Sequence, residues 1–575
     1  MKRLFPILIF SIMANAQNKS GFLTAYEKGN GSQTATYEET IAYFQLLDQN
    51  FETIAMQEMG LTDSGEPLHI VTFNADKNFD FKAIQKEKAV LLINNGIHPG
   101  EPDGIDATMM LFRDLALGKI KVPKNLVIVN IPIYNIGGAL NRNSFSRANQ
   151  NGPESYGFRG NARNYDLNRD FLKSDTRNAR SFAQIFHLAN PDVFIDNHVS
   201  NGADYQYTFT YIATHHQKIG GKLGEFWDAE MIPALVSDLK KKNIESVPYV
   251  NIHDEKPDAG FEAFMDYPRY STGFASMFNT LGSMPETHML KDYPSRVKAT
   301  YEYMVSTIDF TDKNYKKIKN LRNENLQNYL PDKKYTLLWQ LDEAKASGIP
   351  FLGFEGGYKP SEISGKPRLF YDEKKSFSKM IPYRKEFKPL LEVMIPEAYV
   401  IPKAWWNVID LLKINNIQMA PLEKDTELEV ESYRIEDFKT SGTAYEGHYP
   451  HHSVSVSAAK KKVLFKKGDF VVKTQQPGVK YLLEALEPQA NDSYFAWNFF
   501  DSVLQQKEYF SAYVFEDLAK KLLDGNPELK ASFEKKKAED KKFSDSGEAQ
   551  LDWIYRHSDY YEKTHMQYPV YRIMK

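Results

Sequence analysis

The sequence predicts an α/β layer protein, in which the strands of a central sheet alternate with helices packed on its faces. Two observations favour this class. Between about residues 89 and 289, apolar runs alternate with amphipathic segments of helical spacing. The polar residues that could carry chemistry follow the apolar runs directly, where α/β sheets usually place their ligands.

The first elements follow from this periodicity. The runs AVLLINNG from Ala89 and NLVIVNIPIYN from Asn125 are typical of buried strands. The segment DATMMLFRDLALGK between them, from Asp106, has the apolar spacing of a helix. DVFIDNH from Asp192 and YTFTYIAT from Tyr207 predict two further strands. Strands and helices therefore alternate through this part of the chain.

The later part of the chain has a different pattern. Residues 311–335 are charged and poor in turn residues until Pro331, which indicates a solvated helix leading to a domain boundary. Residues 451–472 alternate strictly and then turn at Lys467, Gly468 and Asp469, which is typical of strands. The aromatic-rich remainder indicates mainly helices. We therefore expect a β-rich module at 335–475 and a mainly helical region at 476–575.

Composition limits the possible functions. The 575 residues include 72 basic and 75 acidic side chains, for a formal net charge of -3, so no strong field favours nucleic acid. There is no cysteine, which excludes cysteine proteases, disulfides and cysteine zinc sites. Any metal must therefore be held by His and carboxylate side chains.

The N-terminus has the layout of a secretory signal peptide. Lys2 and Arg3 precede a short apolar core, and Ala14 and Ala16 precede Gln17. We assign residues 1–16 to this peptide and expect a bacterial protein exported to the periplasm or the exterior. No later segment is long and apolar enough to predict a transmembrane helix.

Candidate metal ligands follow the first predicted strand. His98 and Glu101 are separated by Pro99 and Gly100, which bend the chain so that both side chains can face one atom. A hydrolytic zinc site takes three protein ligands and leaves a position open for water. His198, at the end of the DVFIDNH strand, supplies a third ligand. Each motif alone fits an ordinary turn or a half-buried histidine, and His448 with Glu446 is left open as a second metal site.

The order of motifs resembles the zinc carboxypeptidases of the carboxypeptidase A-like family. Between the metal segments lies Asp166-Leu167-Asn168-Arg169, similar to the Asp-x-Asn-Arg signature of that family, whose metal motif is His-x-x-Glu with a distant His. The resemblance covers roughly residues 30–310. It implies an α/β/α catalytic domain with a mixed central sheet at 17–310, one Zn²⁺ and a peptide substrate with a free C-terminal carboxylate. The charged segment that follows is assigned to a linker helix at 311–334.

The resemblance also implies roles for individual residues. Asn168 and Arg169 would bind the substrate carboxylate, for which a planar guanidinium fork is suited. Asp166 would accept a hydrogen bond from the imidazole of His98 and orient it. Glu286, in MPETH after a late predicted strand, would act as general base and then acid.

Two further roles have rival residues. For the arginine that stabilises the oxyanion we favour Arg147, with Arg159 and Arg163 as alternatives. For the substrate-contacting tyrosine we favour Tyr270, with Tyr267 as the alternative. The sequence predicts neither the preferred C-terminal side chain nor the oligomeric state.

The sequence therefore predicts an exported zinc metallocarboxypeptidase that hydrolyses the C-terminal peptide bond. Two other functions stay open. A zinc deacylase or amidase acting on N-acyl amino acids or cell-wall peptides could use the same metal, base and carboxylate-binding residues. A binding protein on an inactive peptidase scaffold could use the C-terminal region instead, although such a protein need not keep all the ligands and Glu286.

Overall fold

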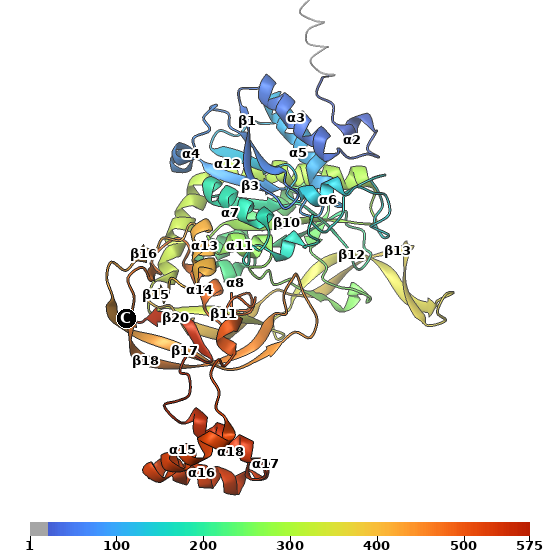
Figure 1. Cartoon of the computed structure of the whole chain (residues 1–575). Coiled ribbons are helices and arrows are strands. Elements are labelled where there is room, and N and C mark those ends of the chain that lie inside the picture. Colours follow the sequence, from blue (N-terminus) through green and yellow to red (C-terminus); the bar gives the residue numbers. More distant parts are fainter. Residues whose placement is uncertain (1–20) are drawn as a thin grey trace, which may run out of the picture.

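A nine-stranded mixed sheet forms the centre of the computed structural model, which describes residues 21–575 (Figure 1). The predicted signal peptide at 1–16 lies outside the described residues. The spatial order is β1-β2-β4-β3-β5-β10-β7-β8, with β6 beside β10. Strands β4, β3, β5 and β10 run parallel, whereas β2 and β7 run antiparallel to β4 and β10. The predicted mixed sheet is confirmed. The strands are β1 Ile54–Leu61, β2 Pro67–Phe73, β3 Ala89–Asn94, β4 Leu126–Ile131, β5 Val193–Asp196, β6 His198–Ser200, β7 Phe209–Ala213, β8 Ser246–Pro248 and β10 Leu281–His288.

Helices cover both faces of this sheet. Along β10, Ser283 accepts a hydrogen bond from Tyr303 of helix α12, whereas Gly282 faces Thr272 of helix α11. Because successive side chains of a strand point to opposite faces, α12 and α11 lie on opposite sides of the sheet. Glu286 shares the face of Gly282 and therefore points to the α11 side. The helices of this part are α2 Ala25–Lys28, α3 Tyr37–Asn50, α4 Phe81–Glu87, α5 Asp103–Ala116, α6 Ile136–Leu140, α7 Arg177–Ala189, α8 His216–Ile219, α9 Gly221–Phe226, α10 Ile232–Lys241, α11 Ser271–Ser276 and α12 Tyr293–Asn325.

The elements form where the sequence pattern is strongest. All six residues of β3 and of β4 are buried, as expected for parallel strands covered on both faces. Helix α5 buries Ile105, Met109 and Phe112, which recur at helical spacing. The ring of Phe112 packs edge-on against Phe44 of α3, with 5.7 Å between centroids. Because β3, β5 and β10 run parallel, their carboxyl ends lie at one edge of the sheet.

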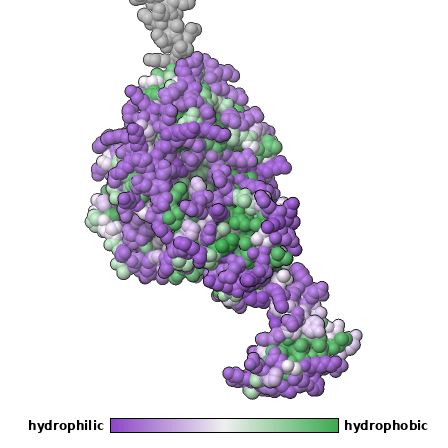
Figure 2. All heavy atoms as spheres, turned by 90° about the vertical axis from the view of Figure 1, so that its left-hand side faces the viewer, coloured by the Kyte–Doolittle hydropathy of each residue, from purple (hydrophilic) through white to green (hydrophobic). Residues whose placement is uncertain are grey.

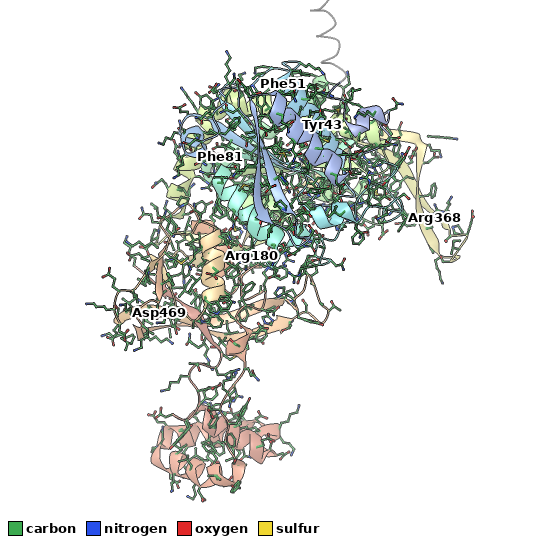
Figure 3. The ribbon with its side chains drawn as sticks, turned by 45° about the horizontal axis from the view of Figure 1, so that its top comes forward. Tyr43, Phe51, Phe81, Arg180, Arg368 and Asp469 are labelled. Carbon is green, nitrogen blue, oxygen red and sulfur yellow. The ribbon has the colours of Figure 1, made fainter. Side chains whose placement is uncertain are left out.

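Helix α12 is continuous, so the predicted division at residue 310 falls within it. After this helix the chain forms three further β structures, of which the smallest is the antiparallel pair of β11 and β14. Strands β12 and β13 form a long hairpin, which also pairs with β9 and carries Arg368 on its projecting part (Figure 3). Six further strands form a sheet in the order β16-β19-β15-β20-β17-β18, which includes the last strand of the chain. The strands are β9 Phe261–Glu262, β11 Lys334–Leu341, β12 Ser347–Pro360, β13 Pro367–Arg384, β14 Phe387–Met394, β15 Ala398–Ile401, β16 Ala420–Pro421, β17 Thr426–Thr440, β18 His451–Phe465, β19 Phe470–Lys473 and β20 Gln567–Ile573.

The six-stranded sheet, with its helices and loops between residues 395 and 504, is called the C-terminal module below. Its helices are α13 Trp406–Ile414 and α14 Val479–Leu486. Tyr481 of α14 packs against Phe274 and Phe278 beside α11, and the apolar core is continuous across this contact. The module therefore packs against the α11 side of the nine-stranded central sheet.

Four helices near the C-terminus form a separate lobe below the body in Figure 1. They have their own apolar core, which includes Phe515, Phe533 and Leu551. The face in Figure 2 is largely hydrophilic, with smaller apolar patches on the body and the lobe. Between residues 21 and 575, no helix has the length and apolar character needed to cross a bilayer. The lobe helices are α15 Ala512–Gly525, α16 Pro527–Glu539, α17 Lys541–Ser544 and α18 Gly547–Arg556.

Candidate metal centre

Three buried side chains meet at the carboxyl edge of the sheet. After β3 the chain turns at Pro99 and Gly100, and the backbone N–H of Glu101 donates to the carbonyl of His98. Nδ1 of His98 lies 3.2 Å from Oε1 of Glu101, and Nδ1 of His198 lies 3.1 Å from Oε2. A Cβ at Gly100 would lie 2.5 Å from Nε of Arg147, so a larger residue there would displace this guanidinium from Glu101. The structure thus brings the three predicted metal ligands together.

Each of the two imidazoles is oriented by a carboxylate on its far nitrogen. Nε2 of His98 lies 2.9 Å from Oδ1 of Asp166, and Nε2 of His198 lies 3.0 Å from Oδ2 of Asp196. Both rings consequently turn Nδ1 toward Glu101. Asp166 stands where the sequence placed it, but Asp196 was missed. The signal was available, because residues two apart near a strand end share a face.

The donor chemistry of this cluster fits a divalent cation. Burial alone raises the pKa of Glu101, but Arg147 and His98 outweigh it and hold the pKa well below its ordinary value. Two imidazole nitrogens and one ionised carboxylate form the ligand set of many hydrolytic zinc sites. The candidate donor atoms lie within 4.8 Å of one another, and they form the one such cluster found in residues 21–575. The cluster could hold one metal ion.

Glu446 and His448, left open as a second metal site, make other contacts. Oε2 of Glu446 accepts the backbone N–H of Asp166 at 2.9 Å, and Nε2 of His448 lies 2.7 Å from Oδ2 of Asp175. They belong to no metal-ligand cluster in the part of the chain that the structure describes.

Glu286 lies beside the metal ligands. It stands opposite His198 in the parallel register of β10 and β6, and both line the same cavity. Thr210 donates a hydrogen bond to its carbonyl at 2.8 Å, which fixes the strand at this point. Burial raises the pKa of the Glu286 carboxyl to about 8, partly offset by His198. The side chain is thus positioned to exchange a proton in the cavity.

Two of the three candidate arginines reach the metal centre. Arg147 forms an ion pair with Glu101 and donates to Gln150 at 2.8 Å. Arg159 donates to Oδ2 of Asp166 from Nε at 3.0 Å and from Nη2 at 2.8 Å, so this guanidinium is committed to the carboxylate that orients His98. Arg163 lies 3.8 Å from Asp63 and is absent from the cavity lining.

The predicted carboxylate-binding residues line the same cavity. The Asn168 side-chain oxygen accepts the backbone N–H of Ser271 at 3.1 Å, which leaves its NH2 group for another partner. The Arg169 guanidinium lies over the ring of Tyr270, 4.6 Å from its centroid. Tyr267 is not in the cavity lining and instead lies 5.6 Å from Lys218 Nζ. Tyr270 is thus the better placed of the two tyrosines.

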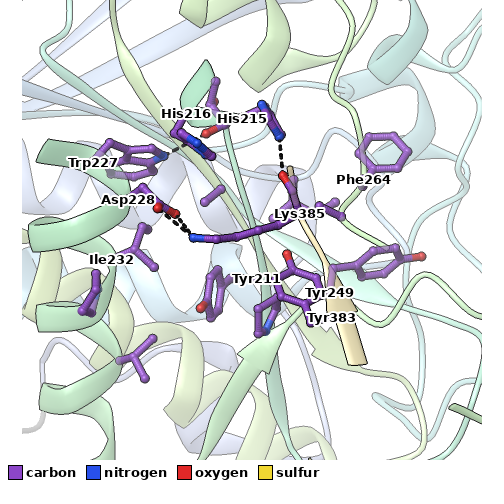
Figure 4. A pocket seen from close by; sticks show the side chains of 17 residues that line it. Tyr211, His215, His216, Trp227, Asp228, Ile232, Tyr249, Phe264, Tyr383 and Lys385 are labelled. Atoms are coloured by element: carbon purple, nitrogen blue, oxygen red, sulfur yellow. Dashed lines mark hydrogen bonds and ion pairs between the residues drawn. The ribbon is translucent and has the colours of Figure 1, made fainter. Parts of the chain in front are cut away.

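The cavity that joins these groups has a volume of about 320 Å³. A second cavity of about 270 Å³ shares Ile212, Tyr249 and Phe264 with it (Figure 4). Tyr211, Trp227 and Tyr383 contribute aromatic rings to this second cavity, and Lys385 is neutralised there by Asp228 at 2.6 Å. The metal centre therefore has next to it a second cavity that combines aromatic and aliphatic side chains with the Asp228–Lys385 ion pair.

Comparisons with known proteins agree with the motifs. No family model matches the chain. Carboxypeptidase 2 from Trichophyton rubrum is 19% identical over 488 residues, which cover 81% of this chain and 84% of that protein. This sequence relative confirms the resemblance to carboxypeptidases.

Solved carboxypeptidase structures also overlap part of the chain. A metallo-carboxypeptidase from Burkholderia cenocepacia is 14% identical, with a TM-score of 0.37 over 48% of this chain and 70% of that one. The carboxypeptidase A from Helicoverpa armigera is 13% identical, with a TM-score of 0.35 over 54% and 80%.

Proposed function

We propose that the protein is an exported zinc metallocarboxypeptidase that removes residues from the C-terminus of peptides. The observation that carries this proposal is the one cavity lined by the metal-ligand cluster and by the side chains of Glu286, Asn168 and Arg169. Export is inferred from the sequence pattern of residues 1–16.

His98, Glu101 and His198 would hold the zinc ion. When bound, zinc supplies a Lewis acid that polarises a carbonyl and lowers the pKa of water. Asp166 and Asp196 keep Nδ1 of each histidine facing the ion and favour the metal-binding tautomer.

Glu286 is the proposed proton carrier. The positive charge of a zinc ion held nearby would favour the ionised form of this carboxyl group, which would accept a proton from the attacking water and then deliver it to the nitrogen of the leaving amino acid. Glu101 cannot do this, because its two oxygens face the histidine nitrogens. Arg147 pairs with the metal-ligand candidate Glu101 through one nitrogen, whereas Arg159 is bound to Asp166 through two, so we assign the oxyanion to Arg147.

Asn168 and Arg169 would bind the terminal carboxylate of the substrate. The guanidinium of Arg169 and the amide NH2 of Asn168 supply N–H donors for both oxygens of a carboxylate. Tyr270 packs on Arg169 and would contact the same end of the peptide. The side chain of the released residue would enter the second cavity, where Tyr211, Trp227 and Tyr383 lie. We therefore expect a preference for substrates that end in a large apolar residue.

Matched peptides test this proposal directly. Zinc-loaded protein is incubated with a peptide mixture and with the same peptides carrying C-terminal amides, and products are followed by mass spectrometry. We expect stepwise loss of single C-terminal residues, fastest for Phe, Tyr and Leu, and no shortening of the amides. Internal cleavage, or equal rates on acid and amide, would refute the proposal. Release of acyl groups without peptide shortening would favour the deacylase.

A further inference from the structure

The C-terminal module reaches into the candidate substrate site. Its loop from Tyr445 to His448, called the clamp loop below, contacts the segment 165–175 that carries Asn168 and Arg169. Oε2 of Glu446 accepts the backbone N–H of Asp166 at 2.9 Å, although the two residues are 280 positions apart. Gly447 has a φ of 80°, and a Cβ there would lie 2.4 Å from the Tyr165 hydroxyl. The close approach of the loop therefore requires glycine.

The far end of the same segment is held by a buried charge network. Nε2 of His448 lies 2.7 Å from Oδ2 of Asp175. Lys173 Nζ, whose side chain is 0% exposed, binds Asp175 and Asp170 at 2.7 Å each. Lys173 also lies 5.4 Å from the ring of Trp497 of the module. Both ends of the segment are thus fastened to the module.

Tyr270 is fastened through its neighbour. The backbone N–H of Arg269 donates to Asp492 at 2.7 Å, and its guanidinium binds the same buried carboxylate at 2.6 Å. That guanidinium lies 5.6 Å from the ring of Tyr445 and 5.1 Å from the ring of Trp497. The module residues that make these contacts lie far from the metal-binding motifs in the sequence.

We propose that the clamp loop and Asp492 position Asn168, Arg169 and Tyr270, so that the C-terminal module is part of the substrate carboxylate site. This inference rests on the proposed function, since it assigns the same three residues to the peptide terminus. Glu446, His448 and Asp492 are positioning residues, because they act through the backbone and side chains of residues 166–175 and 269. The three metal ligands make no hydrogen bond to the module within the described residues, and the module reaches them only through Asp166, which orients His98.

Substitutions at Glu446 separate positioning from general stability. Glu446→Ala removes the acceptor for the Asp166 N–H, whereas Glu446→Gln keeps a carbonyl oxygen there. For acetyl-Ala-Ala-Phe we expect Glu446→Ala to raise KM about tenfold, with kcat within about twofold and zinc content unchanged. Glu446→Gln should restore KM. Tyr449→Phe, at a side chain that is 54% exposed four residues beyond Tyr445, is the matched control and should match the parent.

Two results would overturn the inference. One is an unchanged KM in Glu446→Ala. The other is an equal loss of melting temperature, zinc and kcat in both Glu446 variants, which would indicate a general structural role.

Amide hydrogen exchange of the full chain tests the positioning role without depending on catalysis. We expect the amides of residues 166–169 to exchange at least about tenfold faster in Glu446→Ala than in the parent or Glu446→Gln, because the Asp166 N–H loses its partner. Unchanged exchange would overturn the positioning role. If the parent shortens no peptide, the proposed function fails on that result, while exchange still decides whether the loop holds the segment.

Discussion

The metal-ligand cluster and the carboxylate-binding residues share one cavity but are supported in different ways. His98 and Glu101 lie on the turn that follows β3, and His198 begins β6. Asp196, which orients His198, ends β5, whereas Asp166, which orients His98, lies on the segment 165–175 that the module contacts. Asn168, Arg169 and Tyr270 stand on loops that the C-terminal module holds. The metal ligands are thus placed mainly by the sheet, with the module reaching them only through Asp166, while recognition of the peptide terminus depends on the module throughout.

Loss of a metal ligand should give the largest effect. His198→Ala leaves two of three ligands, so we expect zinc content to fall from about one equivalent to almost none and kcat/KM to fall at least about 10³-fold. Metal analysis and peptide release measure both quantities. His452→Ala, at an exposed histidine of the module, should match the parent. A variant that keeps its zinc would show that the cluster is assigned wrongly.

Removal of the oxyanion arginine should come next. Arg147→Ala is expected to lower kcat by about 10²- to 10³-fold with zinc retained, as loss of one oxyanion donor does elsewhere. Steady-state kinetics on one peptide measures this change. Arg163→Ala, outside the cavity, serves as the control and should change kcat by less than twofold. A larger effect at Arg163 than at Arg147 would exclude the assignment.

Loss of an orienting carboxylate should be milder. Asp196→Asn keeps the shape of the side chain but not the charge on Nε2 of His198. We expect zinc affinity to weaken about 10- to 100-fold, measured by competition with a chelator. KM for the peptide should stay within about twofold, because the carboxylate-binding residues are held elsewhere. A large rise in KM with unchanged zinc affinity would contradict the separation of the two regions.

The smallest effect concerns the packing of the module on the sheet. His187 of α7 lies 3.4 Å from Asn415 of the module, and burial lowers its pKa to about 4. Above pH 6.5 the residue is neutral in both folded and unfolded chains. As the pH falls from 6.5 toward 4 the unfolded chain binds the proton first, so stability decreases by about 2 kcal/mol at pH 5 and by about 3 kcal/mol at pH 4.

Urea unfolding at pH 7 and pH 5 measures this loss. In His187→Gln the part of the pH dependence that comes from this residue should disappear. An identical pH dependence in parent and variant would show that His187 does not couple module packing to pH.

The sequence predicted the sheet-borne part of the site better than the loop-borne part. His-x-x-Glu follows one predicted strand and His198 ends another, and parallel strands end at the same edge of a sheet. This placement, together with the motif order that resembles the zinc carboxypeptidases, identified the ligands. Asp196 was missed although it stands two residues before His198. Glu446, His448 and Asp492 could not be assigned, because their contacts with residues 166–175 and 269 join distant segments that no periodicity relates.

The fold was likewise easier to predict for the central sheet than for the C-terminal module. Continuous apolar runs identified β3, β4 and β5, which are buried on both faces. The strand Gln567–Ile573 joins the module sheet between β15 and β17, far from its neighbours in sequence. Strand pairing across such distances depends on tertiary packing rather than on local propensity.

The most direct test of the account compares the zinc-loaded parent with Glu286→Gln. Zinc equivalents and release of C-terminal amino acids from one peptide mixture are measured on the same preparations. The account predicts about one zinc in both proteins and a rate of release at least about 10²-fold lower in the variant. Equal release by both proteins, or no zinc in the parent, would contradict a metal-dependent peptidase with Glu286 as its base.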